Sequence, residues 1–160
     1  MATIREKAIQ AIRDQLATIT IANGYSRDIG PKRVYGVKET PSEVVPPAVL
    51  IMQGEEEVDN NIGERYSCEL EIAVGFVDNS RTKDPDKDAT TFLGEIQKCL
   101  QIEFTIVHGV YPSGEDAPQN IVLKEVANSI NVSTGVSGII MGQVTYIMCY
   151  RRNIYDPNKF

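Results

Sequence analysis

One segment near the middle of the chain constrains the fold more than any other. Apolar side chains occupy every even position over residues 66–76, while Ser67, Glu69 and Glu71 stand between them. Successive side chains of a β-strand point to opposite faces, so this period of two predicts a strand with one buried and one solvated face. Such a strand belongs to a sheet that is covered on one side, and the rest of the chain must supply that cover.

Two amphipathic helices are predicted to provide it. Residues 3–17 carry apolar side chains every four residues, and Thr3 with Glu6 can form a capping box at the start. A second helix is expected over about residues 88–101, with Asp86 or Asp88 as its cap. We expect one core beneath the sheet, built from Ile12, Leu16, Leu70, Ile72, Val74, Phe92, Leu93 and Ile96.

Further strands are predicted over residues 33–37, 48–52, 121–132 and 139–151, the last two as a hairpin joined by a glycine-containing turn. Residues 53–64 are rich in Glu, Asp and Asn and are predicted to form an acidic loop, or a loop with ragged strand ends. The expected fold is α+β, with a mixed, mainly antiparallel β-sheet and two amphipathic helices packed on one face. We expect a single domain over residues 1–160, with a polar tail over residues 153–160.

Composition limits the classes of function. The formal net charge is −6, which disfavours a dedicated nucleic-acid-binding protein because such proteins neutralise phosphates. The three cysteines, Cys68, Cys99 and Cys149, are widely spaced and predict neither a disulfide framework nor a zinc site, which fits a reducing compartment. No stretch approaches the roughly 20 apolar residues that cross a bilayer, so no membrane association is expected.

The residues that could carry chemistry are sparse. His108 is the one histidine, and no partner can be named that would position it for acid–base work. Oxygen ligands for a divalent cation could come from residues 55–59, or from Asp84, Asp86 and Asp88, but solvated loop charges are the favoured interpretation of both groups. We therefore expect no catalytic residues, no cofactor and no metal, which favours a structural protein over an enzyme.

Three stretches resemble one family. They are residues 4–19 followed by Gly24-Tyr25 and residues 28–30; residues 46–51 with the acidic segment and residues 70–74; and residues 150–152 with Asp156-Pro157. Together they resemble the tail-terminator proteins of long-tailed bacteriophages, also called minor tail protein U-like or tail-completion proteins. The resemblance is spread over nearly the whole chain as a pattern of elements and short words, without a diagnostic signature.

The resemblance implies a structural virion protein in the phage tail or neck, assembled in the cytoplasm of a host bacterium. Its subunits would form a hexameric ring that caps the tail tube and joins it to the head–neck connector. The genome would pass through the lumen without specific binding, since acidic walls repel phosphates. Two alternatives stay open: another neck or tail protein, such as a connector adaptor or a tube subunit, and a small cytoplasmic ligand-binding module or enzyme.

The assembly surface is predicted at the acidic segment and at the ends of the long C-terminal strands. Strands longer than the helices that cover them leave surface that natural proteins keep for a partner. In a ring, acidic side chains of one subunit could then meet arginines of its neighbour. The candidate interface residues are Glu55, Glu56, Glu57, Asp59, Tyr146, Tyr150, Arg151 and Arg152.

Overall fold

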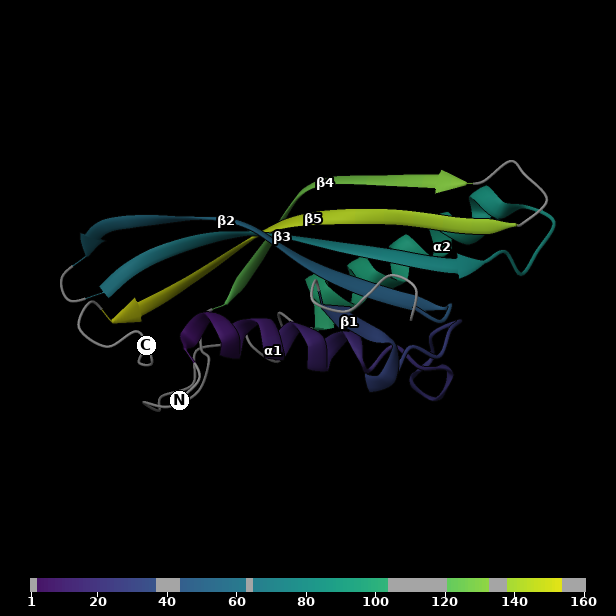
Figure 1. Cartoon of the computed structure of the whole chain (residues 1–160), viewed down its shortest axis with the longest axis horizontal. Coiled ribbons are helices and arrows are strands. Elements are labelled where there is room, and N and C mark those ends of the chain that lie inside the picture. The colour runs from purple at the N-terminus through teal and green to yellow at the C-terminus, as the bar shows by residue number, and fades with distance from the viewer. Residues whose placement is uncertain (1–2, 37–43, 63–64, 104–120, 133–137, 154–160) are drawn as a thin grey trace.

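The computed structural model describes residues 3–36, 44–62, 65–103, 121–132 and 138–153, with the backbone alone for residues 60–62, 65, 103, 152 and 153. Within these ranges, two α-helices and five strands follow one another in the predicted order, with short helical turns between them (Figure 1). The elements are α1 (Ile4–Leu16), η1 (Ile21–Asn23), η2 (Pro31–Arg33), β1 (Val34–Gly36), β2 (Ala48–Ile62), β3 (Arg65–Asn79), α2 (Pro85–Gln97), η4 (Lys98–Glu103), β4 (Val122–Val132) and β5 (Ile139–Asn153).

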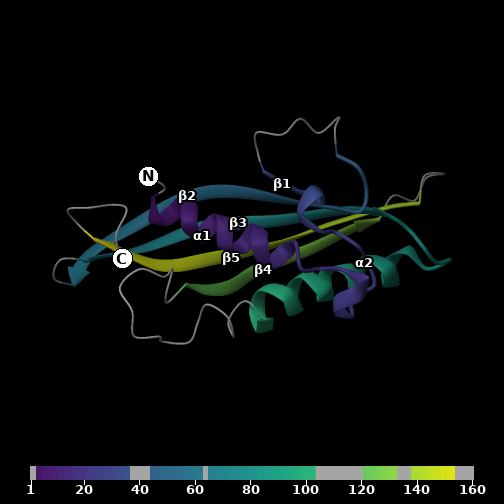
Figure 2. The ribbon, with the colours of Figure 1, turned by 90° about the horizontal axis from the view of Figure 1, so that it is seen from below.

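The strands form one five-stranded sheet in the order β1-β2-β3-β5-β4. The short β1 runs parallel to β2, and every other pair is antiparallel, including the β4–β5 pair that was predicted as a hairpin. Both helices lie on the same face of the sheet (Figure 2). The predicted fold class, a mixed and mainly antiparallel sheet with two helices on one face, is therefore confirmed.

The helix ends follow local capping chemistry. Thr3 accepts a hydrogen bond from the Glu6 backbone amide, and the Glu6 carboxylate accepts one from the Thr3 amide, as the capping box predicts. The second helix begins earlier than expected, because Asp84 rather than Asp86 or Asp88 accepts from the Lys87 amide. Pro85 then occupies the first helical position, where its missing N–H costs nothing.

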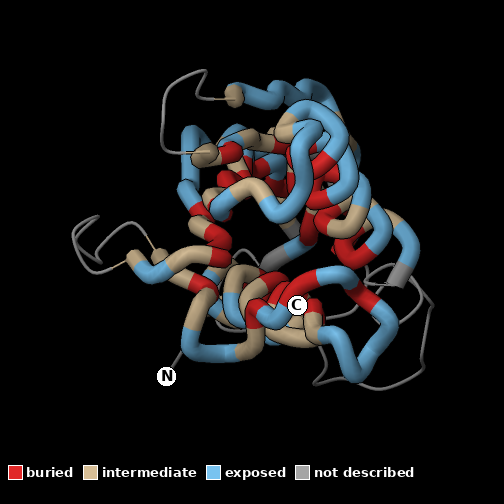
Figure 3. The backbone as a smooth tube through the Cα atoms, turned by 90° about the vertical axis from the view of Figure 1, so that its right-hand side faces the viewer, coloured by how far each residue is buried: buried red, intermediate tan, exposed pale blue. Residues whose placement is uncertain are grey.

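A single core lies between the sheet and the helices. All eight residues predicted to be buried together belong to it, and the alternate side chains of β3 from Cys68 to Phe76 are at most 2% exposed. Figure 3 shows the buried residues gathered toward the middle of the cross-section. The period of two over residues 66–76 thus sets the face that packs on the helices, and packing an aliphatic side chain there contributes about 2 kcal/mol.

The acidic segment was predicted wrongly as a loop. Residues 53–62 instead continue β2 and pair with β3, with a bulge between Gln53 and Glu56. Pairing with a strongly patterned neighbour overrides the low strand propensity of Glu, Asp and Asn, because strand propensity depends on context. As a result β2, β3 and β5 reach past the first turn of α1, so that one end of the sheet projects beyond the helices (Figures 1 and 2).

Candidate functional site

The two tyrosines predicted at the assembly surface are not on the surface of this chain. Tyr146 is 0% exposed and Tyr150 is 2% exposed, so the expectation that they form an exposed patch is wrong. They fall in the phase of β5 that pairs with Ile72 and Cys68, which also face the helices. Ile140 and Val144 stand in the same phase of β5 and are also fully buried.

The acidic residues, by contrast, lie at the projecting end of the sheet. Glu55, Glu57 and Asp59 are exposed on β2, whereas Glu56 is half-buried and accepts a hydrogen bond from the Tyr150 hydroxyl of the same chain. Glu56 is therefore occupied by an internal contact. Glu55 and Glu57, its two neighbours on β2, are exposed and can meet another molecule.

Two of these carboxylates share the bare face of the sheet. Glu57 pairs directly with Glu69 of β3, and Asp59 pairs with Ser67. Together with Val58 they line a shallow depression of about 370 Å³, which we call the acidic depression: Glu57, Val58, Asp59, Ser67 and Glu69. Glutamates directly opposite on neighbouring strands repel one another, so this arrangement costs the isolated chain free energy.

The predicted arginines lie at the same end. Arg151 is exposed on β5 and pairs with Ser67, which lines the acidic depression and pairs on its other side with Asp59. Arg151 therefore borders the acidic depression. Arg152 is the next residue of β5 and pairs with Tyr66; its side chain is outside the described part. The structure thus brings the predicted acidic and basic residues to one end of one subunit, not to opposite ends.

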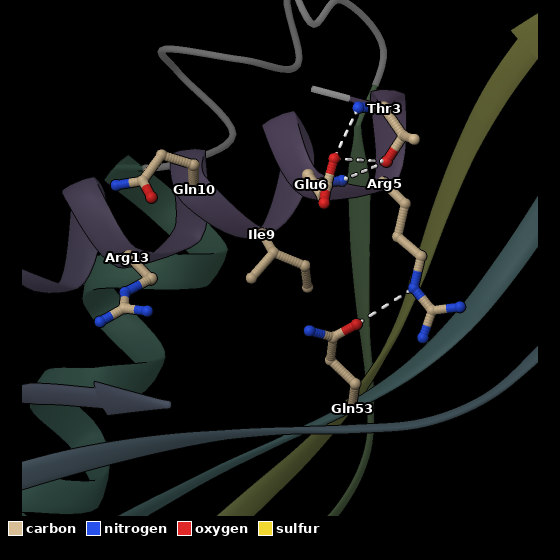
Figure 4. Close-up of a pocket in the computed structure, with 7 residues that line it drawn as sticks. All are labelled: Thr3, Arg5, Glu6, Ile9, Gln10, Arg13 and Gln53. Carbon is tan, nitrogen blue, oxygen red and sulfur yellow. Dashed lines mark hydrogen bonds between the residues drawn. The ribbon is translucent and has the colours of Figure 1, made fainter. Parts of the chain in front are cut away.

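A second hollow lies between α1 and β2. It measures about 440 Å³ and is lined by Thr3, Arg5, Glu6, Ile9, Gln10, Arg13 and Gln53 (Figure 4). We call it the arginine groove. The Arg5 Nε atom donates to Gln53 Oε1 at 3.0 Å, which ties α1 to β2, and Arg13 donates from Nη2 to the carbonyl oxygen of Val34 at 3.1 Å.

The arginine groove was not predicted as a site, although its pattern is visible in the sequence. Arg5, Ile9 and Arg13 recur every four residues, so they form one row along α1 beside the buried stripe. The row faces β2 only because the helix docks on the sheet at that angle, which the sequence does not specify. Chemically, the groove presents two guanidinium groups around a half-buried isoleucine, an arrangement suited to carboxylates carried on a partly apolar surface.

A buried ionic cluster lies at the other end of β3 from the acidic depression. Arg27 is 2% exposed; its Nε atom donates to Asp78 Oδ2 at 2.8 Å, and its guanidinium lies 4.5 Å from the centre of the Phe92 ring. Glu95 approaches Arg27 at 3.7 Å, and Arg81 approaches Asp78 at 3.3 Å. This cluster joins the α1–β1 connection to β3 and α2. Glu95 Oε2 makes no hydrogen bond there and meets Arg27 only as an ion pair. The cluster is enclosed by its own chain, and we assign it a structural function.

Asp88 belongs to the same end of the fold. Burial by itself would raise the pKa of the Asp88 carboxyl, but hydrogen bonds from the Arg81 amide, the Ser80 hydroxyl and the Thr82 amide outweigh burial and hold that pKa below its usual value. The carboxylate stabilises the turn between β3 and α2. The cation ligand role considered for it is disfavoured, because its oxygen Oδ2 already accepts three hydrogen bonds.

The cysteines differ in their surroundings. Cys68 and Cys99 are fully buried, while Cys149 is half-buried on the bare face and its thiol donates to Glu69 Oε1 at 3.8 Å. Burial raises the pKa of the Cys149 thiol and Glu69 adds to this, whereas Lys124 lowers it. The reactivity of the Cys149 thiol therefore depends on the charge of Glu69, which lines the acidic depression.

Within the described ranges, no three His, Cys, Asp or Glu side chains come together as metal ligands. Nor does the described part contain a helix that is long and apolar enough to cross a membrane. His108 lies outside the described residues, as does most of the predicted tail. No protein-family model matches the chain, and no curated protein matches it significantly.

Proposed function

We propose that this chain is a structural virion protein that assembles into a ring, as a tail terminator does at the head-proximal end of a phage tail tube. The observation that carries the proposal is the sheet with one helix-covered face and one bare face, whose acidic end projects beyond the helices. A projecting, charged sheet end supplies contact surface for other subunits without disturbing the core. The resemblance of the element pattern to tail terminators points in the same direction.

The charge of the bare face fits such a role. Glu57, Asp59, Glu69 and Glu71 are all exposed there or at its edge. If this end of the sheet borders the lumen of a ring, the carboxylates repel the phosphates of DNA, so the genome slides without sticking. The partners would be further copies of the chain, the tail tube protein and the head–neck connector.

Size-exclusion chromatography with light scattering tests the proposal. The expected species is a hexamer, with six times the 17.7 kDa mass of the chain, alone or in a salt-dependent equilibrium with the monomer. Electron microscopy of phage particles that lack this protein should show tails of uncontrolled length without heads attached. A chain that stays monomeric at every concentration, together with normal particles in its absence, would exclude the function.

A connector adaptor or a tube subunit is the second candidate. It is favoured by the two open edges of the sheet, since β4 and the acidic half of β2 each have a strand partner on one side only among the described strands. Open edges allow continued strand addition. Long filaments of the purified chain would support a tube subunit over a terminator.

A small ligand-binding module is the third candidate. The arginine groove is the feature that favours it, because its volume of about 440 Å³ lies in the range of small-molecule sites. A monomer whose melting temperature rises with a carboxylate ligand would favour this function over a virion role.

A further inference from the structure

The acidic depression and the arginine groove carry opposite charge on different parts of one subunit. Glu57 and Glu69 lie on the bare face, because they alternate with side chains of the helix-covered face such as Leu70. Arg5 and Arg13 lie on the other side of the sheet, on α1 (Figure 4). The two surfaces therefore cannot satisfy each other within one copy of the chain.

We propose that the acidic depression of one copy docks into the arginine groove of the next copy, head to tail. This inference rests on the proposed ring and names the surfaces that form it. A closed ring needs two different, complementary surfaces on each subunit, and these two surfaces meet that requirement. The interface differs from the predicted contact between Glu55–Glu57 and Arg151–Arg152, because those residues lie at the same end of the subunit.

The acidic depression keeps an arrangement that is unfavourable in a lone subunit. Glu57 and Glu69 are direct cross-strand neighbours with like charge. Guanidinium groups from another subunit would turn this repulsion into attraction, since one arginine can donate to two carboxylate oxygens at once. The free energy lost in the monomer is recovered in the assembly.

The arginine groove can hold more than one carboxylate. Arg5 and Arg13 are eight residues apart on a helix, which is about 12 Å along its axis, and the half-buried Ile9 lies between them. Glu57 and Asp59 of the acidic depression are two residues apart on a strand, which is about 7 Å, so both carboxylates fit within the length of the groove.

Sedimentation velocity on single charge reversals tests this interface. Glu57→Lys should weaken self-association about tenfold or more, because it places a cation against Arg5 and Arg13. Its melting temperature should stay the same or rise, since the introduced ammonium group would pair with Glu69 of the same chain. Arg5→Glu should weaken association similarly, while a carboxylate in the first turn of α1 favours the helix dipole and preserves the monomer.

The double variant Arg5→Glu with Glu57→Lys should regain association, because the charges are exchanged and again complementary. Lys83→Glu is the matched control for Arg5→Glu: Lys83 is exposed in the β3–α2 connection, at the other end of β3 from the acidic depression. This control should assemble as the unchanged chain does.

The outcomes distinguish a failure of the docking interface from a failure of the ring. A ring that forms equally well in both single variants overturns the docking and leaves the ring intact. A chain that never associates overturns both. A monomeric chain whose tail tube protein binds through Arg5 would assign the arginine groove to a different partner and overturn the second-copy interface.

Discussion

The two faces of the sheet are made by the same strands and yet differ in what holds them. On the helix-covered face, Leu70, Ile72 and Val74 of β3 are fully buried. On the bare face, Glu69 and Glu71 lie one residue away and are exposed. Stability therefore resides on one face, while the other face is free to vary in charge and is the one available for assembly. Substitutions one residue apart should separate these two roles.

The largest contrast is expected between Ile72 and Glu71. Ile72→Ala removes a fully buried side chain from the core and should lower the free energy of unfolding by about 2–5 kcal/mol. Glu71→Ala on the bare face should change it by less than about 0.5 kcal/mol. Urea unfolding followed by circular dichroism measures both. Equal losses would mean that the two faces do not differ in this way.

A second contrast uses two glycines. A Cβ atom at Gly142 would lie 2.4 Å from two atoms of the Phe76 ring and 2.8 Å from the Ser129 carbonyl oxygen. Gly142→Ala should thus cost about 1–3 kcal/mol through overpacking. At Gly75 the nearest atoms would lie at 3.7 Å, an ordinary contact, so Gly75→Ala should be neutral or slightly stabilising.

Thermal melting of the two alanine variants tests whether Gly142→Ala is less stable than Gly75→Ala. The ring of Phe76 fills the space above Gly142 and packs on Phe92 with ring centres 4.6 Å apart, so it has little room to move away. A Gly142→Ala variant as stable as Gly75→Ala would show that the aromatic pair is less constrained than its contacts indicate.

The stability that the buried Asp88 carboxylate contributes should depend on pH. Because the pKa of Asp88 is lower in the folded chain than in the unfolded chain, its contribution to stability is complete above about pH 4 and is lost as the pH falls through the folded pKa. Asp88→Asn should lower stability at neutral pH and flatten the loss below about pH 4. Parallel acid-unfolding curves of the variant and the unchanged chain would contradict this.

The smallest effect concerns the bare face alone. Glu69→Gln should speed alkylation of Cys149 a few-fold at mildly alkaline pH, because the carboxylate contributes to the raised pKa of the thiol. Lys124→Gln should slow it, since Lys124 acts in the opposite direction. Cys68 and Cys99 are buried and should not react in the folded chain, so mass spectrometry after iodoacetamide reads Cys149 directly. Changes of the same sign in both variants would rule out this electrostatic explanation.

The interface residues were predicted less well than the core. The exposed carboxylates Glu55, Glu57 and Asp59 are where a partner could reach them, but Tyr146 and Tyr150 are buried. The sequence contains a signal for the phase of β5 that the interface prediction did not use: Gln143, Thr145 and Arg151 all stand at odd positions, which indicates that the even positions, Tyr146 and Tyr150 among them, face the core. Pairing with the clearly patterned β3 fixes the phase.

Local chemistry in the sequence determined the elements of this protein. Thr3 and Glu6 start α1, the period of two makes β3, and the apolar rows of both helices choose the side that packs, because all of these depend on neighbours within a few residues. Tertiary structure decided what depends on distant partners. It extended β2 through its acidic residues, enclosed Arg27 with Asp78 and Phe92, and set Arg5 beside Gln53 and Arg13 beside Val34. Strand register and helix docking are relations between segments far apart in the chain, so no single stretch of sequence contains them.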